Sequence, residues 1–178
     1  MNRQQNYKET TPDMLIDTID NKDKVTGVIK RNEVLKSFQN FRVVHVFLFN
    51  EKEELLIQKI SSKNNRHPFY WGSSVAGYLF AGEEYEAAAV RRIKQELGID
   101  VSNLKFFGKV VMKEETGDKM IGLFTCRYNG EVYPTHDSIL KTEFHSLRNI
   151  EEMLKNDTRK FTPTFILLFN SLLNPSND

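Results

Sequence analysis

The residues best suited to chemistry lie in the segment 77–99, where glycines, carboxylates and arginines follow one another at fixed spacing. Five residues separate Gly77 from Glu83, and near the end of the segment Arg92 and Glu96 stand four positions apart, within one helical turn. A carboxylate such as that of Glu96 suits Mg²⁺ or Mn²⁺, hard cations that are usually shared with phosphates, and a guanidinium suits a phosphate directly. These side chains are therefore candidates for holding a metal ion or a phosphate, unless they are only solvated helix charges.

Hydrophobic spacing predicts a helix over residues 84–97. Its predicted apolar stripe, suited to packing on a sheet, consists of Ala89, Val90, Ile93 and Leu97. Arg92, Gln95 and Glu96 share another face of the same helix. Gly98 stands where a glycine commonly ends a helix.

The spacing of the whole segment resembles the Nudix box, the signature of enzymes that cleave diphosphates linked to another moiety. The resemblance gives a structural role, bracing the loop and the helix, to Gly77, Glu83, Arg91 and Gly98. The family pattern expects glutamates where this chain has Arg92 and Gln95, so two of three expected carboxylates are missing and Glu96 remains. The resemblance thus implies Mg²⁺ or Mn²⁺ bound through Glu96, and only weakly without substrate.

The resemblance covers roughly residues 13–175 and points to the branch of the family related to isopentenyl-diphosphate isomerase. The strand pair RVVHVFLFN and ELLIQK, the approach PFYWGSSVAG and the later FTPTF carry it. The isomerases use a Cys before the box glycine and a His after it, where this chain has Ala76 and Tyr78. Alanine has no proton to exchange, and a phenol is a poor substitute for imidazole at a metal ion. Hydrolysis is therefore expected rather than isomerisation.

The pattern of elements predicts an α+β or α/β fold, a mixed β-sheet sandwiched between α-helices, as in the Nudix fold. Strands are expected at 13–19, 24–29, 41–50, 54–60, 69–77, 104–113, 119–128 and 141–146. Helices are expected at 31–37, 84–97 and 150–155, and from Pro163 behind the N-cap residue Thr162. The strands at 41–50 and 54–60 read as a β-hairpin. We expect one domain over 13–175, preceded by a flexible segment at 1–12.

A general base must reach the attacking water, and this family often supplies it from outside the box. Glu115 and its neighbour Glu114, in the turn KEETGDK, are candidates, and so is Asp137. Acidic residues in polar turns are usually only solvated. His45 lies mid-strand with Val43 and Phe47 on its face, and we expect it in the interior.

Three candidate substrate-binding residues precede the box: Lys59, Arg66 and Trp71. The two basic side chains could contact a diphosphate, and the indole could stack on a base or a prenyl-like group. A solvated loop and a core aromatic cluster are the alternative interpretations.

Composition argues against several other classes. With 25 basic and 24 acidic residues the net charge is +1, so neither nucleic acid nor an anionic membrane is an expected partner. The single Cys126 cannot form an internal disulfide and is expected to be buried, and residues 1–13 contain no apolar signal region. We expect a cytoplasmic protein, with a homodimer possible by analogy only.

The leading hypothesis is a metal-dependent hydrolase that cleaves the P–O–P bond of a small nucleoside-diphosphate-linked or similar substrate, with Glu96, Glu115 and Arg92 as catalytic residues. The alternative is a weakly active or inactive module of the same fold that binds a phosphorylated ligand or a partner. The substitutions at Arg92 and Gln95 motivate it.

Overall fold

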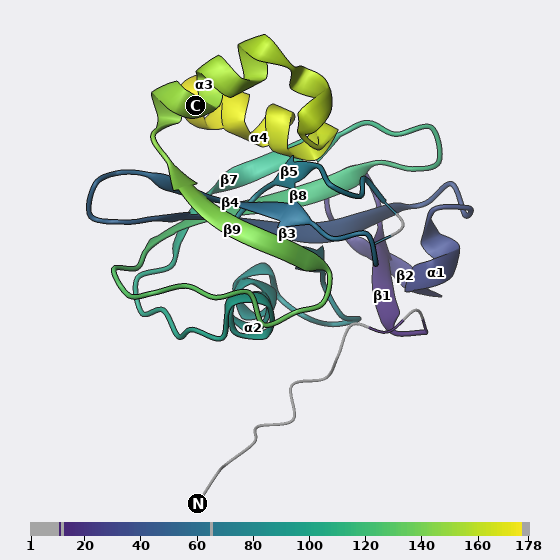
Figure 1. Cartoon of the computed structure of the whole chain (residues 1–178). Helices are drawn as coiled ribbons and strands as arrows, with labels where there is room; N and C mark the ends of the chain where they lie inside the picture. Colours follow the sequence, from purple (N-terminus) through teal and green to yellow (C-terminus); the bar gives the residue numbers. More distant parts are fainter. Residues whose placement is uncertain (1–10, 12, 65, 176–178) are drawn as a thin grey trace, which may run out of the picture.

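The computed structural model describes residues 11, 13–64 and 66–175, so the predicted flexible segment 1–12 lies outside it except for Thr11. In this part of the chain a mixed β-sheet lies between helix α2 on one side and helices α3 and α4 on the other (Figure 1). The strands are β1 (Leu15–Ile19), β2 (Val25–Lys30), β3 (Asn40–Phe49), β4 (Leu55–Ile60), β5 (Trp71–Gly72), β6 (Val75–Tyr78), β7 (Lys105–Met112), β8 (Lys119–Arg127) and β9 (Ile139–His145). The helices are α1 (Arg31–Val34), α2 (Tyr85–Leu97), α3 (Leu147–Asn156) and α4 (Pro163–Leu173), with a 3-10 turn η1 (Thr158–Lys160). The predicted sandwich is confirmed.

Strand β3 is the centre of the sheet. One edge pairs in parallel with β8 along its whole length, and the other edge meets β1, then β6, then β4. The predicted hairpin of β3 and β4 is therefore wrong in extent, because the two strands pair only at Phe49 and Leu55. Beyond that pair β6 takes the edge of β3, and β4 pairs with β9 and β5 instead. This exchange brings the segment before the box into the middle of the sheet.

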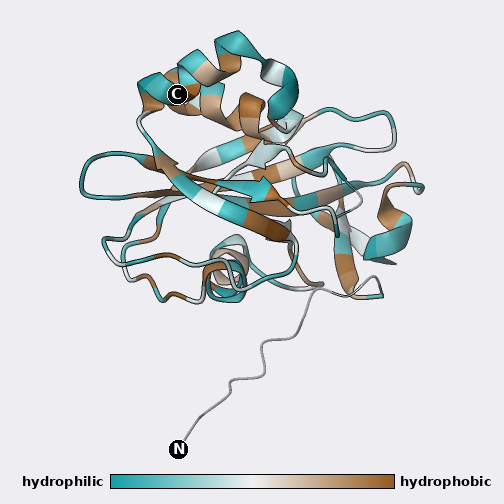
Figure 2. Ribbon diagram, viewed as in Figure 1, coloured by the Kyte–Doolittle hydropathy of each residue, from teal (hydrophilic) through white to brown (hydrophobic). Residues whose placement is uncertain are grey.

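Side chains of β3 alternate between two apolar cores, one on each face of the sheet. Val43 and Phe47 pack towards α3 and α4, whereas Val44 and Val46 pack towards α2, as the alternation predicted. Apolar residues accordingly concentrate along the central strands and on the inner sides of the helices (Figure 2). Cys126 is buried in the core between the sheet and α2, as expected.

Helix α2 begins at Tyr85 and ends at Gly98, whose φ of 69° is a left-handed conformation that glycine adopts without a Cβ clash. Ala89, Ile93 and Leu97 are buried as predicted, but Val90 is 46% exposed. The correction follows from the helical period. The buried stripe is centred on Ala89 and Ile93 and extends towards Arg92, which leaves Val90 outside the contact with the sheet.

The two C-terminal helices cover the opposite face of the sheet. Helix α4 begins as predicted, with the Thr162 hydroxyl accepting a hydrogen bond from the Phe165 amide at 3.2 Å. Helix α3 starts three residues earlier than predicted, because the Ser146 hydroxyl accepts from the Asn149 amide and caps the helix. In the described part of the chain no helix is long and apolar enough to cross a membrane.

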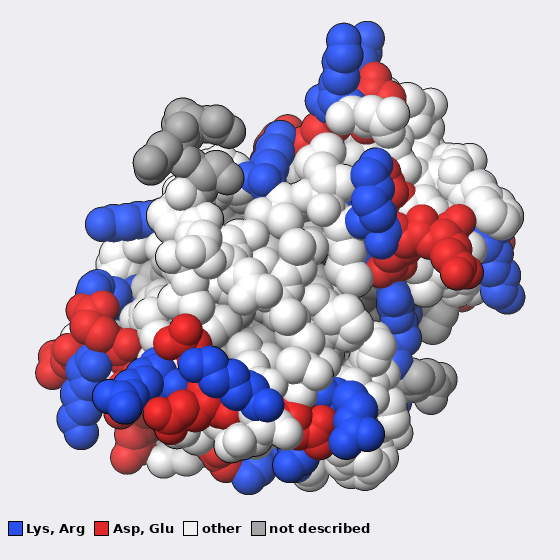
Figure 3. All heavy atoms as spheres, turned by 90° about the horizontal axis from the view of Figure 1, so that it is seen from above, with Lys and Arg blue, Asp and Glu red and all other residues white. Residues whose placement is uncertain are grey.

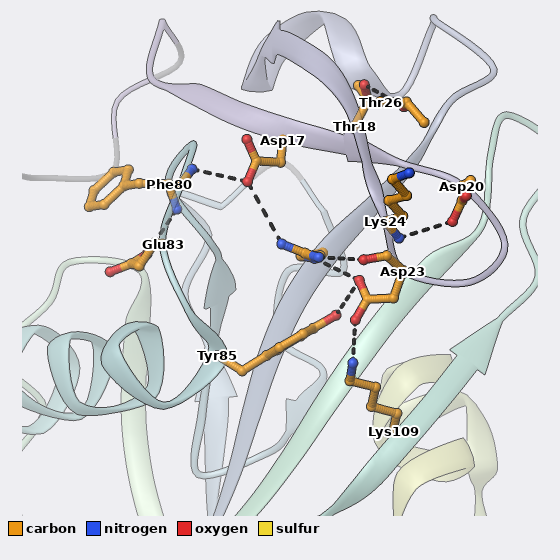
Figure 4. A network of polar contacts seen from close by, with 12 residues as sticks. Asp17, Thr18, Asp20, Asp23, Lys24, Thr26, Phe80, Glu83, Tyr85 and Lys109 are labelled. Carbon is orange, nitrogen blue, oxygen red and sulfur yellow. Dashed lines mark hydrogen bonds and ion pairs between the residues drawn. The ribbon is translucent and has the colours of Figure 1, made fainter.

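A polar network fastens the β1–β2 hairpin to α2 and to the sheet (Figure 4). Asp23, in the hairpin turn, accepts from Arg42 Nε at 2.6 Å and from the Tyr85 hydroxyl at 3.2 Å, and it pairs with Lys109. Asp17 accepts from the Gly82 amide at 3.0 Å, in the loop that leads into α2. The two carboxylates of the hairpin therefore contact strands β3 and β7, helix α2 and the loop that leads into α2.

Burial raises the pKa of Asp23, but hydrogen bonds from Lys109 and Arg42, together with their charges, outweigh this and hold the pKa below its ordinary value of 3.8. Because the pKa is lower in the folded protein than in the unfolded chain, the charged carboxylate stabilises the fold above pH 3.8. That contribution is lost as the pH falls through the folded pKa.

We expect Asp23→Asn to lower the free energy of unfolding at pH 7 by about 1.5–3 kcal/mol, the usual contribution of hydrogen bonds to charged groups. Urea unfolding measured between pH 7 and pH 2.5 checks this, because the difference between parent and variant should shrink below pH 3.8. Asp13→Asn, at a carboxylate that is 75% exposed, is the control and should change little. A pH-independent difference would contradict the account.

Candidate functional site

A cavity of about 1150 Å³ opens where β3, β4, β6 and β8 meet the turn after β7 and the start of α4. Its basic lining residues, within the described chain, are Arg31, Lys63, Arg66, Arg92 and Lys119. Its acidic lining residues are Glu114 and Glu115. Basic side chains thus outnumber acidic ones five to two on the described wall, an excess that favours an anionic ligand.

The Arg92 side chain lies against Gly77, the first glycine of the box. Its Nε donates to the Ala76 carbonyl at 3.1 Å and one terminal nitrogen donates to Gln95 at 3.2 Å. Another terminal nitrogen forms an ion pair with Glu96. A Cβ on Gly77 would overlap the Arg92 side chain, so the glycine is needed for the arginine to lie there.

Glu96 is only 2% exposed and both of its carboxylate oxygens have partners. Oε1 pairs with Arg92, and Oε2 accepts from Gln58 Nε2 at 3.4 Å. The other amide atom of this residue, Gln58 Oε1, is buried without a hydrogen-bond partner among the described residues. The predicted metal ligand is therefore held by an internal cation.

Of the four predicted structural residues of the box, Glu83 and Arg91 pair beside the entry to α2, Gly77 lies in β6, and Gly98 caps the other end of the helix. Glu83 forms two 2.7 Å hydrogen bonds with Arg91, and its carboxylate also accepts from the Phe80 amide at 2.8 Å. Arg91 donates in addition to the Tyr78 carbonyl at 3.0 Å. These contacts close the loop between β6 and α2 on itself, consistent with the bracing role.

Lys119 and its partners form the opposite wall of the cavity. Lys119 is 7% exposed, pairs with Glu114 at 2.6 Å and donates to the Thr164 hydroxyl at 3.1 Å. Arg66 approaches Glu114 at 3.7 Å, and Glu115 lines the same cavity. Burial lowers the pKa of Lys119, although Glu114 opposes the shift.

His45 lines the cavity from the middle of β3 and is not simply a core residue. Its Nδ1 and the Ser73 hydroxyl are 2.8 Å apart, and burial together with the charge of Lys119 lowers the pKa of His45 to about 3. The imidazole is therefore neutral at physiological pH. Lys119, which lowers this pKa, was not predicted as a site residue, because its one signal is a lysine at the start of an apolar strand.

Two of the three predicted substrate-binding residues do not reach the cavity. Lys59 and Trp71 are cross-strand partners in β4 and β5, and the Lys59 ammonium lies 5.5 Å from the centre of the indole. Trp71 is 7% exposed and packs in the core, so only Arg66 lines the cavity. Asp137, the alternative base, pairs at 2.6 Å with Lys63 and is itself exposed.

The fold and the site together define a class: an α/β sandwich in which the helix after a glycine-bounded loop contributes to a cavity lined mainly by basic side chains. The chain belongs to the Nudix family, since the model of the NUDIX domain matches residues 39–165. An uncharacterized Nudix hydrolase of Listeria monocytogenes is 32% identical over 83% of this chain and 85% of its own length.

The isomerase resemblance is also supported. The isopentenyl-diphosphate Delta-isomerase of Pectobacterium atrosepticum is 24% identical over 85% of this chain and 87% of its own length.

A crystal structure of a Deinococcus radiodurans protein superposes with a TM-score of 0.78 at 21% identity, covering 88% of this chain and 97% of that one. Against a Nudix hydrolase of Listeria innocua, 46% identical where it aligns, the chain spans only 46% of the relative's length.

Nudix proteins generally use divalent metal ions, but the donors of this chain do not fit one. Among the described residues no three His, Cys, Asp or Glu side chains come together as a metal site. Glu96 is already neutralised by Arg92, and Ala76 and Tyr78 offer no imidazole or thiol beside the box glycine. Metal binding by Glu96 thus stays a prediction without supporting ligands.

The burial of the Arg92 and Glu96 pair can be tested through its effect on stability. We expect Glu96→Gln to lower the free energy of unfolding by about 3–5 kcal/mol, since it leaves the Arg92 guanidinium buried without a counter-charge. The double variant Arg92→Met, Glu96→Leu should recover most of that loss. Urea unfolding measures both.

The matched control is the pair Arg148 and Glu152 on α3, which has the same spacing but is exposed at 88% and 57%. We expect Glu152→Gln to change the free energy of unfolding by less than about 0.5 kcal/mol. Equal effects of the two substitutions would show that the Arg92 pair is not desolvated as described.

Proposed function

We propose that this Nudix-family protein binds a small molecule carrying a diphosphate group in the cavity between β3, β4, β6 and β8. The observation that carries the proposal is the basic wall itself, with Arg66 and Lys119 on one side and Arg92 on the other. Guanidinium and ammonium groups with restricted exposure to water bind phosphate oxygens through charge-assisted hydrogen bonds.

The size and the lining of the cavity support a ligand larger than inorganic phosphate. About 1150 Å³ is enough for a nucleotide or a comparable small molecule. Tyr78 and Met112 add apolar surface beside the charged groups. On the face seen from above, basic and acidic side chains alternate around the periphery and do not form a single-sign patch, in keeping with a small ligand (Figure 3).

Hydrolysis of a P–O–P bond is the second candidate function. Family membership favours it, and so does the position of Glu115 on the cavity wall, where a carboxylate could accept a proton from water. The cationic wall would stabilise charge on the departing phosphate. The pairing of Arg92 with Glu96 weighs against fast turnover, since it occupies the carboxylate that the box retains.

Calorimetric titration with inorganic diphosphate, nucleotide sugars, dinucleotides and prenyl diphosphates tests binding. We expect Arg66→Gln and Lys119→Met to weaken the best ligand by about tenfold each, the loss of one charge-assisted contact. Lys155→Gln, an exposed lysine at the end of α3, is the charge-matched control and should not change the affinity.

Phosphate release from the same panel, with Mg²⁺, with Mn²⁺ and with chelator, separates the two functions. Release that Glu115→Gln abolishes without weakening binding would establish hydrolysis. Binding without release would leave a ligand-binding module. If no compound binds, or if Lys155→Gln weakens binding as much as Arg66→Gln, the proposed site is wrong.

A further inference from the structure

We propose that Arg92 is a built-in counter-ion that takes the place of a divalent cation in the box, so that the cavity takes its diphosphate ligand free of metal. The role of Arg92 concerns the chain alone and is argued from the contacts of this residue. Metal-free binding of the ligand rests on the proposed function.

The oxygen atoms that contact Arg92 are of the types that bind hard cations. The guanidinium contacts a main-chain carbonyl on Ala76, an amide oxygen on Gln95 and a carboxylate oxygen on Glu96. Carbonyl, amide and carboxylate oxygens are the preferred ligands of Mg²⁺ and Mn²⁺. Here the guanidinium contacts all three.

The charge balance of this cluster is already complete. Arg92 is 7% exposed and Glu96 is 2% exposed, and their opposite charges are in direct contact. A divalent ion placed at the same oxygens would meet the guanidinium at close range in a medium that screens charge poorly. Removing Arg92 from its place would also leave the buried carboxylate of Glu96 without a counter-charge.

The arginine is held in this position by the local backbone. The side chain fits only because Gly77 lacks a Cβ, and its Nε is fixed by the Ala76 carbonyl in the same strand. Strand β6 is itself paired with β3 from Val75 to Tyr78. The cation is therefore part of the sheet architecture and not a mobile surface charge.

The consequence for the ligand concerns its charge state. A metal-free diphosphate presents its full negative charge to Arg66 and Lys119, whereas a Mg²⁺ complex presents much less. Mg²⁺ in solution should therefore compete with the protein for the diphosphate and not assist its binding.

Titration of the parent protein with inorganic diphosphate and with ADP, in chelator and in excess Mg²⁺, tests the ligand half. We expect the affinity to be at least about tenfold higher in chelator. Equal or tighter binding in Mg²⁺ would overturn this half while leaving the proposed site intact. Absence of binding in both buffers would overturn the proposed function and this half with it.

Electron paramagnetic resonance titration with Mn²⁺ alone tests the role of Arg92 independently of any ligand. We expect no specific Mn²⁺ binding by the parent protein and one bound ion in Arg92→Glu, which places two carboxylates one turn apart among the same oxygens. The unfolding temperature of Arg92→Glu should rise with Mn²⁺ concentration, since the ion binds only the folded state.

Two further variants keep the test decisive. Arg92→Gln removes the charge without adding a second buried carboxylate, and it should bind Mn²⁺ more tightly than the parent even if Arg92→Glu does not fold. Arg148→Glu makes the same charge change on the exposed face of α3 and should bind no Mn²⁺. The inference is overturned if the parent binds Mn²⁺ and Glu96→Gln abolishes it, or if neither Arg92 variant gains Mn²⁺ binding.

Discussion

A guanidinium and a carboxylate that are both almost excluded from water bind each other on one face of helix α2, and the neighbouring structure depends on that contact. Neither group can be removed alone, because the other would remain buried and charged. The contact draws Arg92 against β6 and requires a glycine at position 77. One contact therefore neutralises a buried charge and places the Arg92 side chain between α2 and β6.

The order of strands at the centre of the sheet makes this contact possible. Because β6 displaces β4 from the edge of β3, the strand before the box lies directly over α2 and beside the cavity. The Glu83 and Arg91 pair then fixes the loop that joins β6 to α2. The Asp17 carboxylate of the hairpin holds the same loop by accepting a hydrogen bond from the Gly82 amide. The wall of the cavity is thus anchored on two sides.

Much of this was readable from the sequence, for local reasons. The alternation in β3, the cap at Thr162 and the terminal Gly98 are encoded by neighbouring residues. The β3–β4 hairpin was predicted too long because the pairing depends on which strand occupies the edge of β3, and the same long-range pairing places Lys59 opposite Trp71, away from the cavity. Val90 is exposed because the buried stripe of α2 turns towards Arg92. Lys119 and His45 became cavity residues only through the parallel pairing of β3 with β8, which no local pattern reports.

The central claim is that a side-chain cation fills the box in place of a metal ion. Paramagnetic relaxation measured on the backbone amides of the isotope-labelled parent protein tests it most directly, since bound Mn²⁺ broadens nearby amide signals. We expect Mn²⁺ to leave the amides of Gly77, Leu97 and Gly98 unchanged relative to a diamagnetic control. Selective broadening of these three amides at low Mn²⁺ concentration would contradict the account.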